Sequence, residues 1–205
     1  MFGIVARDRR SGAVGAAAVY ETATLASVTP RREGAIVLSL GAPPPGIFDP
    51  PGIADPTGVA DPLDRAPDLR EALRTLLATD SDRDTRQLLV VDARGRTAAH
   101  SGRSCPRLFG HTEGTDHSAG GNGMDSANVV GAMSLSFERS DGDPLWLRLA
   151  LAVESGASAA QEVRLHQIAR LVVYPAGGGP AIDVQIGARE RPTADLRRAL
   201  SDSGQ

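Results

Sequence analysis

Most of the side chains that could take part in catalysis gather in the middle of the chain. A predicted strand ends at Asp92, the sequence Asp-Ala-Arg-Gly indicates a tight turn, and a second predicted strand leads to His100. A glycine-rich stretch follows and carries the single cysteine, Cys105, together with His111 and Asn122. We therefore predict that this stretch is a loop that lines a site.

His111 is the side chain in this stretch best suited to proton transfer, because an imidazole changes charge near neutral pH. We predict a catalytic role for it, and the alternative is a histidine on an exposed loop. His100 ends a strand and faces either the core or the same loop, and we place it among the substrate-binding residues. The spacing of His111 and His117 matches no standard metal motif. We therefore expect no metal and no other cofactor.

Asn122 and Cys105 are predicted to contact the substrate. The amide of Asn122 could donate a hydrogen bond where negative charge develops, and the alternative is a turn residue, since asparagine tolerates left-handed backbone. Cys105 could act as a nucleophile only if a base such as His111 lies within hydrogen-bond reach. The alternative for Cys105 is a packing role, because buried cysteines are commonly inert.

Two further candidates follow an apolar strand near the N-terminus. Glu21 would suit general acid or base catalysis if it faced a pocket, and otherwise it is a solvated carboxylate. The hydroxyl of Tyr20 either donates to a substrate oxygen or is satisfied within the core. We assign Glu21 and Tyr20, with His111, to the catalytic group.

The composition is that of one globular domain. The chain has 205 residues, of which 41% are hydrophobic and 23% charged, and this length supports a single sizeable core. All 22 basic residues are arginines, which excludes a lysine nucleophile or a Schiff-base lysine. The net charge is -3 and the arginine doublets are scattered, so we expect no nucleic acid partner.

The sequence indicates neither a membrane nor a secreted protein. No apolar stretch reaches the roughly 18 residues that suggest a spanning helix, and the N-terminus lacks the apolar run of a signal peptide. One cysteine excludes a disulfide within the chain. We expect a cytoplasmic protein without membrane contacts that binds a small-molecule substrate, and a homodimer is left as an open alternative.

The order of predicted elements indicates an α+β fold. Consecutive apolar residues near the N-terminus suggest strands buried on both faces, as in a sheet between two layers. The expected strands are 2–6, 13–19, 35–40, 87–91, 96–100, 166–174 and 181–186, and the expected helices are 67–78, 125–137, one from Pro144, and 193–200. Asp125 is expected to cap the second helix. Strand pairs separated by helices favour stacked sheets with helices outside, in one domain over 1–205.

A proline-rich segment interrupts this pattern. Eight of the 14 prolines fall in residues 43–67, which argues against a strand or a helix there. The segment is predicted either as a lid over the site or as a disordered or plain surface loop.

Several motifs of the chain resemble those of one known family. They are Phe2-Gly-Ile-Val-Ala-Arg-Asp8, Ser11-Gly12 with Gly15, Arg86-Gln-Leu-Leu-Val-Val-Asp-Ala-Arg-Gly95, Gly102 with Cys105, Gly110-His111, Gly120-Gly-Asn122 and Gln167-Ile-Ala-Arg-Leu-Val-Val173. Over nearly its whole length the chain resembles the family called domain of unknown function 1028, which has an N-terminal-nucleophile-hydrolase-like fold. The resemblance implies a four-layer αββα sandwich with antiparallel sheets. It implies no particular reaction, because the family lacks an established one.

The chain departs from that family at positions expected to line its pocket. Gly3 stands where the family has a serine, Tyr20-Glu21 where it has Ser-Arg, and Leu40-Gly41 where it has Thr-Gln. We therefore expect one wall of the pocket to have lost polar groups.

The start of the sequence argues against the chemistry for which the fold is named. That chemistry needs a serine, threonine or cysteine as the mature first residue, whose α-amine accepts the proton. The sequence begins Met1-Phe2-Gly3, and we expect Met1 to be kept because Phe2 is bulky. The leading hypothesis is a diverged enzyme that uses non-covalent acid–base catalysis on a small molecule, in a cyclisation, isomerisation, elimination or hydrolysis that belongs to biosynthesis. The alternatives are an amide hydrolase with a nonstandard nucleophile such as Cys105, and a non-catalytic ligand-binding or assembly protein.

Overall fold

The structure is a computed structural model that describes residues 1–21, 26–30, 36–40, 63, 67–106, 108–161, 167–176 and 182–202. The proline-rich segment 43–67, predicted as a loop or lid, lies outside the described residues except for Leu63 and Pro67.

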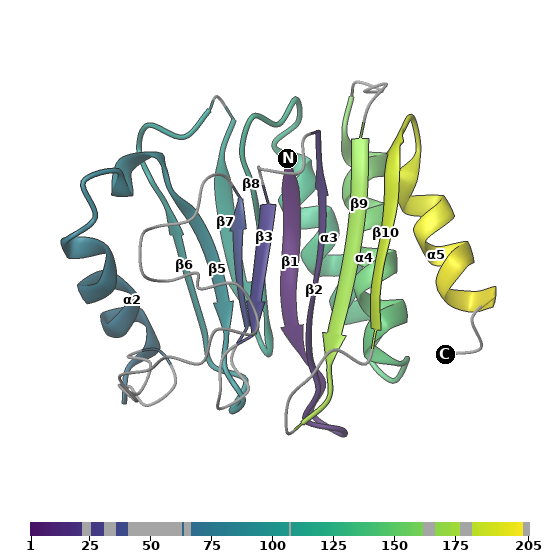
Figure 1. Ribbon diagram of the computed structural model, residues 1–205, viewed down its shortest axis with the longest axis horizontal. Coiled ribbons are helices and arrows are strands. Elements are labelled where there is room, and N and C mark those ends of the chain that lie inside the picture. Colours follow the sequence, from purple (N-terminus) through teal and green to yellow (C-terminus); the bar gives the residue numbers. More distant parts are fainter. Residues whose placement is uncertain are drawn as a thin grey trace.

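Two antiparallel sheets form the centre of the fold (Figure 1). Within the described residues, one sheet has six strands in the order β10-β9-β2-β1-β8-β7, and the other has four in the order β3-β4-β5-β6. The bounds in the six-stranded sheet are β1 Phe2–Arg7, β2 Val14–Tyr20, β7 Gly110–Gly114, β8 His117–Gly121, β9 Gln167–Tyr174 and β10 Ile182–Arg189. Those in the four-stranded sheet are β3 Ala26–Pro30, β4 Ile36–Leu40, β5 Gln87–Val91 and β6 Thr97–Ser101.

Helices cover the outer faces of both sheets. Figure 1 shows α3 (Asn128–Arg139) and α4 (Leu145–Ala159) behind the six-stranded sheet, with α5 (Pro192–Asp202) beside β10. On the other side of the molecule, α2 (Leu69–Ala78) lies beside β6. A short 3-10 helix, η1 (Arg83–Thr85), leads into β5.

Three separate apolar clusters lie between these layers. Neighbouring residues of one strand enter different clusters, because side chains alternate between the faces of a sheet. In β1, Ile4 packs with the cluster under α3 and α4, whereas Val5 packs between the sheets. In β5, Leu89 packs between the sheets, whereas Leu88 packs with the cluster under α2. The predicted four-layer αββα sandwich is therefore confirmed.

The local signals in the sequence account for most of these elements. β1 and β2 are buried along almost their whole length, as their consecutive apolar residues predicted. The side chain of Asp68 caps α2 by accepting from the backbone N–H groups of Arg70 and Glu71. The turn before β6 forms as expected, with Gly95 at a φ of 80°.

The prediction that the glycine-rich stretch is a loop is partly wrong, because β7 and β8 form a hairpin within it. Its glycines reflect close packing more than turn geometry. A Cβ on Gly114 would lie 2.1 Å from the His117 ring, and one on Gly120 would lie 2.9 Å from Leu89 Cδ2. The loop prediction therefore fits the part between β6 and β7 and Asn122 after β8.

The helix predicted from Asp125 begins three residues later, at Asn128. Its N-cap position is Ala127, and the Asn128 N–H donates to Ser126 Oγ at 3.2 Å. The next helix, predicted from Pro144, begins one residue later at Leu145, with Pro144 at the N-cap position.

Candidate functional site

A chain of buried polar side chains crosses the space between the two sheets. Gln87, the first residue of β5, lies at its centre and is completely buried. Its Nε2 lies 2.8 Å from Ser101 Oγ and 3.0 and 2.9 Å from the carbonyl oxygens of Gly110 and Gly121, so three acceptors share its two hydrogens. Its Oε1 accepts from Asn122 Nδ2 at 2.8 Å. Gln87 thus joins β5 and β6 of one sheet to β7 and β8 of the other.

The backbone fixes the direction of both amides in this chain. A carbonyl oxygen can only accept, so the Gln87 group that faces Gly110 and Gly121 must be its NH2 group. Asn122 Nδ2 donates to the carbonyl oxygen of Leu40 at 3.1 Å, which places its nitrogen toward Gln87 Oε1 as well. The donors therefore point one way, from Asn122 through Gln87 to Ser101.

The N-terminus meets this network at Asn122. The α-amino group of Met1 donates to the Asn122 carbonyl oxygen at 2.8 Å, and the Asn122 N–H donates to the Met1 carbonyl oxygen at 2.9 Å. These bonds continue the pairing of β1 with β8 beyond the ends of both strands. The start of β1 is therefore held beside the polar network.

His111 forms the solvent-exposed end of the network. Ser101 Oγ lies 2.9 Å from His111 Nδ1. When the Ser101 hydroxyl donates to Nδ1, the ring hydrogen lies on Nε2; in the other tautomer, Nδ1–H donates to the Ser101 oxygen. Burial lowers the pKa of His111, Glu113 opposes this effect, and the charge of His100 adds to it. We infer that the imidazole is neutral at neutral pH.

A pocket of about 300 Å³ lies along the edge of β7 and includes His111 in its lining. Alternation along β7 directs His111 toward the other sheet and Thr112 toward α3, so the pocket takes residues from both faces of the strand. Its other walls are mostly apolar and include Leu108, Phe109, Met124 and Val130.

Two large apolar side chains stand exposed at the rim of this pocket. Leu108 and Phe109 are 37% and 40% exposed. Leu108 has a φ of 52°, a left-handed conformation that strains a bulky residue. Its carbonyl oxygen accepts from the Met124 N–H at 3.2 Å, which ties the loop to the start of the α3 segment. An apolar rim of this kind is typical of a ligand-binding or interaction surface.

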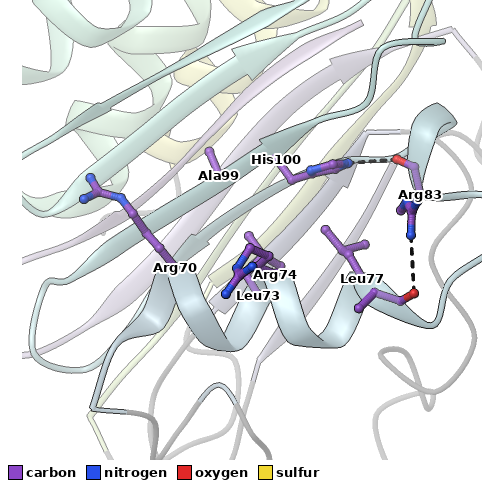
Figure 2. Close-up of a pocket in the computed structure, with 8 residues that line it drawn as sticks. Arg70, Leu73, Arg74, Leu77, Arg83, Ala99 and His100 are labelled. Carbon is purple, nitrogen blue, oxygen red and sulfur yellow. Dashed lines mark hydrogen bonds between the residues drawn. The ribbon is translucent and has the colours of Figure 1, made fainter.

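His100 lies on the opposite face of the four-stranded sheet. Alternation along β6 directs Ser101 toward the other sheet and His100 toward α2. Its Nε2 lies 2.8 Å from the Arg83 carbonyl oxygen, and the residue lines a second pocket, of about 320 Å³, which we call the α2 pocket (Figure 2). His100 and His111 therefore line different pockets, although the charge of His100 contributes to lowering the pKa of His111.

Cys105 packs as a buried thiol against the backbone that leads into β5. Its Sγ donates to the Arg86 carbonyl oxygen at 3.4 Å and lies 3.7 Å from that of Thr85. Burial raises the pKa of this thiol, and a hydrogen bond with the Gly102 backbone offsets the effect only in part. Since the thiolate is the reactive form, this geometry favours the packing role over the nucleophilic one.

Tyr20 and Glu21 lie at the end of β2, which is separated from β7 by β1 and β8. Tyr20 packs between the sheets, and its hydroxyl donates to Gln185 Oε1 at 3.2 Å. Burial raises the pKa of Tyr20, and Glu21 is exposed. Three strand spacings of about 4.8 Å separate β2 from β7, so Tyr20 and His111 are roughly 14 Å apart. The two side chains cannot exchange a proton with the same substrate atom.

Apolar side chains fill the wall where the chain departs from its family. A Cβ on Gly3 would lie 2.6 Å from Leu38 Cδ2 and 2.8 Å from the Ala17 carbonyl oxygen. Leu38 and Leu40 are fully buried between the sheets. Gly41, the last of the substituted positions, lies outside the described residues.

The candidate residues from the sequence therefore separate into several places. Asn122 and His111 belong to one hydrogen-bonded chain, whereas Tyr20, His100 and Cys105 do not. Sequence reasoning missed Gln87 and Ser101, which connect the first pair. Gln87 carried a signal, because it is a polar residue at the start of an otherwise apolar strand. Ser101 carried none.

The described residues contain neither a cluster of metal-ligating side chains nor a membrane-spanning helix. No group of three or more His, Cys, Asp or Glu side chains in these ranges is arranged to hold a metal ion. Nor does any helix of the described part have the length and apolar character needed to cross a membrane.

Comparisons with known proteins place the chain in one family. The model of a family of unknown function, DUF1028, matches residues 1–196. The fold is similar to that of protein SPO2555 from Silicibacter pomeroyi, which carries the same family assignment, with a TM-score of 0.80 and 23% identity over 100% of this chain and 86% of that chain. It is also similar to Anbu (ancestral beta-subunit) from Yersinia bercovieri, with a TM-score of 0.50 and 12% identity over 99% of this chain and 94% of that chain. The search of curated proteins finds no significant match. Since the family model covers almost the whole chain, the protein belongs to the DUF1028 family, and its fold is N-terminal-nucleophile-hydrolase-like.

Proposed function

We propose that this protein is a diverged N-terminal-nucleophile-hydrolase-like enzyme in which His111 performs non-covalent acid–base catalysis on a small molecule. The observation that carries the proposal is the continuous hydrogen-bonded chain from Asn122 through Gln87 and Ser101 to His111. The amides of Gln87 and Asn122 satisfy buried backbone carbonyl oxygens, which is a structural role, but the chain continues through Ser101 to His111, where no backbone group has to be satisfied. A buried polar chain that ends at an exposed imidazole therefore suggests a role beyond packing.

The network determines what the His111 ring can do. With Nδ1 accepting from Ser101, Nε2–H can donate to a substrate oxygen and stabilise negative charge that develops there. The lowered pKa keeps the ring neutral at neutral pH, and developing negative charge beside the ring favours its protonation. Such a group suits a cyclisation, isomerisation, elimination or hydrolysis. Ser101, Gln87 and Asn122 act as positioning residues.

The walls of the His111 pocket suggest the substrate class. Leu108 and Phe109 present apolar surface at the rim, and Met124 adds a side chain that adapts to varied shapes. We propose a small molecule in which a carbonyl or hydroxyl group adjoins an apolar portion. Tyr20, Glu21, His100 and Cys105 are not part of the acid–base step in this proposal.

Untargeted mass spectrometry of a metabolite mixture tests the proposal without a known substrate. We expect the wild-type protein to deplete at least one compound and form a product. Replacing His111→Gln should slow this conversion about 100-fold or more, because general acid–base groups contribute factors of that order. The matched control is Arg198→Gln on α5, which changes an exposed side chain far from β7 and should convert the compound at the wild-type rate.

Two outcomes would overturn the proposal. Equal conversion by the wild-type protein and the His111→Gln variant would exclude His111 from the reaction. Compounds that are bound but never converted would support the non-catalytic ligand-binding alternative. Nitrogen-15 NMR of His111 gives an independent readout of the network: we expect the Nε2–H form in the wild-type protein and a mixture of ring forms in Ser101→Ala.

A further inference from the structure

The α2 pocket combines an apolar floor with a basic rim. Leu73 and Leu77 of α2 line it from below, and Arg70, Arg74 and Arg83 lie around its opening (Figure 2). Leu73 and Leu77 are almost completely buried, whereas the three arginines are exposed. Every charged side chain in the lining carries a positive charge, although the whole chain has a net charge of -3.

Arg83 is the arginine most available to a ligand. Its sequence neighbours are three aspartates, but each is bound to another arginine. Asp80 and Asp82 pair with Arg86 at 2.9 and 3.4 Å, and Asp84 pairs with Arg103 at 2.7 Å. Within the described residues, the Arg83 guanidinium contacts only a backbone carbonyl oxygen, that of Ala78, at 3.4 Å.

The other two arginines are paired but remain open to solvent. Arg70 contacts Glu113 at 3.1 Å and Arg74 contacts Glu71 at 2.6 Å, with the arginine side chains 70% and 76% exposed. The Arg74–Glu71 pair is exposed at both partners and contributes little stability. The Arg70 guanidinium is also open to solvent, although Glu113 is only 18% exposed. An anion at the pocket mouth could therefore share both guanidinium groups.

His100 adds one directed polar group to the pocket. The Arg83 carbonyl oxygen can only accept, so His100 Nε2 must carry the hydrogen that faces it. In the neutral ring this leaves Nδ1 as an acceptor, which suits a protonated group of a bound molecule.

From these features we propose that the α2 pocket binds a small anionic amphiphile, with a carboxylate or phosphate head at the arginines and a short alkyl or aryl group over Leu73 and Leu77. A basic rim over an apolar floor matches both parts of such a molecule. This site lies on the other face of the four-stranded sheet from the His111 network and does not depend on the proposed reaction.

Titrations followed by backbone and arginine side-chain NMR test the proposal. The probes are octanoate, octyl phosphate, octylamine and inorganic phosphate. We expect the two octyl anions to shift the signals of Leu77, Ala99 and the Arg83 Nε–H in a saturable way, and the tighter of the two identifies the preferred head group. Octylamine, which has the same tail and the opposite charge, should bind more weakly, as should phosphate without a tail.

Variants of the α2 pocket separate the contribution of the arginine charge to octanoate binding from that of the apolar floor. Arg83→Gln should weaken octanoate binding about three- to tenfold, because one charge-assisted contact is lost. Ala78→Phe should weaken it as well by narrowing the pocket, and Arg198→Gln on α5 should leave it unchanged. Equal binding of octylamine and octanoate would overturn the proposal. So would octanoate binding that is unaffected by both Arg83→Gln and Ala78→Phe, or shifts that map away from α2 and β6.

Discussion

The two ends of the space between the sheets are built in different ways. At the β7–β8 end, Gln87 and Asn122 are buried amides whose direction is fixed by backbone carbonyl groups. At the β9–β10 end, the Tyr20 hydroxyl makes a single hydrogen bond to Gln185, and Arg170 forms a partly exposed ion pair with a carboxylate on β10. The first end is a connected network, whereas the second is a set of separate pairs.

The network lies in motifs through which the chain resembles its family. Replacing one amide of a network leaves several buried partners unsatisfied, so the members are difficult to change one at a time. Gln87 and Asn122 lie in motifs that the chain shares with its family. Of the departures, Tyr20 and Glu21 lie toward the second end, whereas Gly3 and Leu40 adjoin the network. Gly3 pairs with Gly120, and the Leu40 carbonyl oxygen accepts from Asn122.

The largest effect is expected from removing the centre of the network. Gln87→Met keeps the volume of the side chain but leaves two carbonyl oxygens and an Asn122 N–H without their partner. We expect a loss of about 3–5 kcal/mol in the free energy of unfolding, measured by urea denaturation. Leu88→Met, one residue along the same strand, should cost less than about 1.5 kcal/mol. Equal losses in the two variants would show that the network is not cooperative.

A smaller loss is expected from restoring the family residue at Gly3. The serine Cβ would meet Leu38 Cδ2 and the Ala17 carbonyl oxygen, so Gly3→Ser should cost about 1–3 kcal/mol through overpacking. Combining it with Leu38→Ala should cost less than the sum of the two single variants, because the shortened side chain makes room. If the losses of the two single variants simply added up in the double variant, Gly3 and Leu38 would not be in the close contact described above.

The two ends should also respond to opposite extremes of pH. Burial is the main cause that lowers the pKa of His111 from 6.5, and the same holds for His117, which lies on the other face of β8 beside α3. The unfolded chain therefore binds more protons below about pH 6.5, and the stability should fall as the pH decreases through that range. The pKa of Tyr20 is raised from 10.0 by burial, so its contribution should be lost as the pH rises above about 10.

Unfolding free energies measured across this range check the assignment. His117→Gln should reduce the acid slope, and Tyr20→Phe should reduce the alkaline slope. An acid slope that is unchanged in His117→Gln and in His111→Gln would refute the attribution to these histidines.

The smallest effect is expected from the hydroxyl of Tyr20. Tyr20→Phe removes one hydrogen bond, and Gln185 is exposed enough to bind water instead, so we expect a loss of about 0.5–1 kcal/mol. The control is Tyr174→Phe, since the Tyr174 hydroxyl makes no hydrogen bond within the described part of the chain. A loss above about 3 kcal/mol for Tyr20→Phe would show that this end is also a cooperative network.

Local sequence patterns predicted the helices and strands better than they predicted which of these elements pack against one another. The apolar runs of β1 and β2, the cap of α2 and the turn before β6 are properties of short segments, and the structure has all of them. The hairpin of β7 and β8 was missed because glycine in a sequence usually indicates a turn. Here Gly114 and Gly120 leave room for the side chains of His117 and Leu89, which pack closely against them. The predicted start of α3 at Asp125 differs from the observed start at Asn128, because several polar residues in this segment could each precede the first turn of a helix.

The sequence by itself determined the layered fold, the family and the absence of lysine chemistry, since these follow from periodicity, motifs and composition. It also singled out the glycine-rich segment, but it could not say which of its side chains meet. Only the tertiary structure decided that His111 and Asn122 share a network while His100 faces α2, because adjacent strand residues point to opposite faces and a shift of one residue reverses them. The role of Gln87 was also decided by the tertiary structure, because its amide forms hydrogen bonds with residues of three other strands.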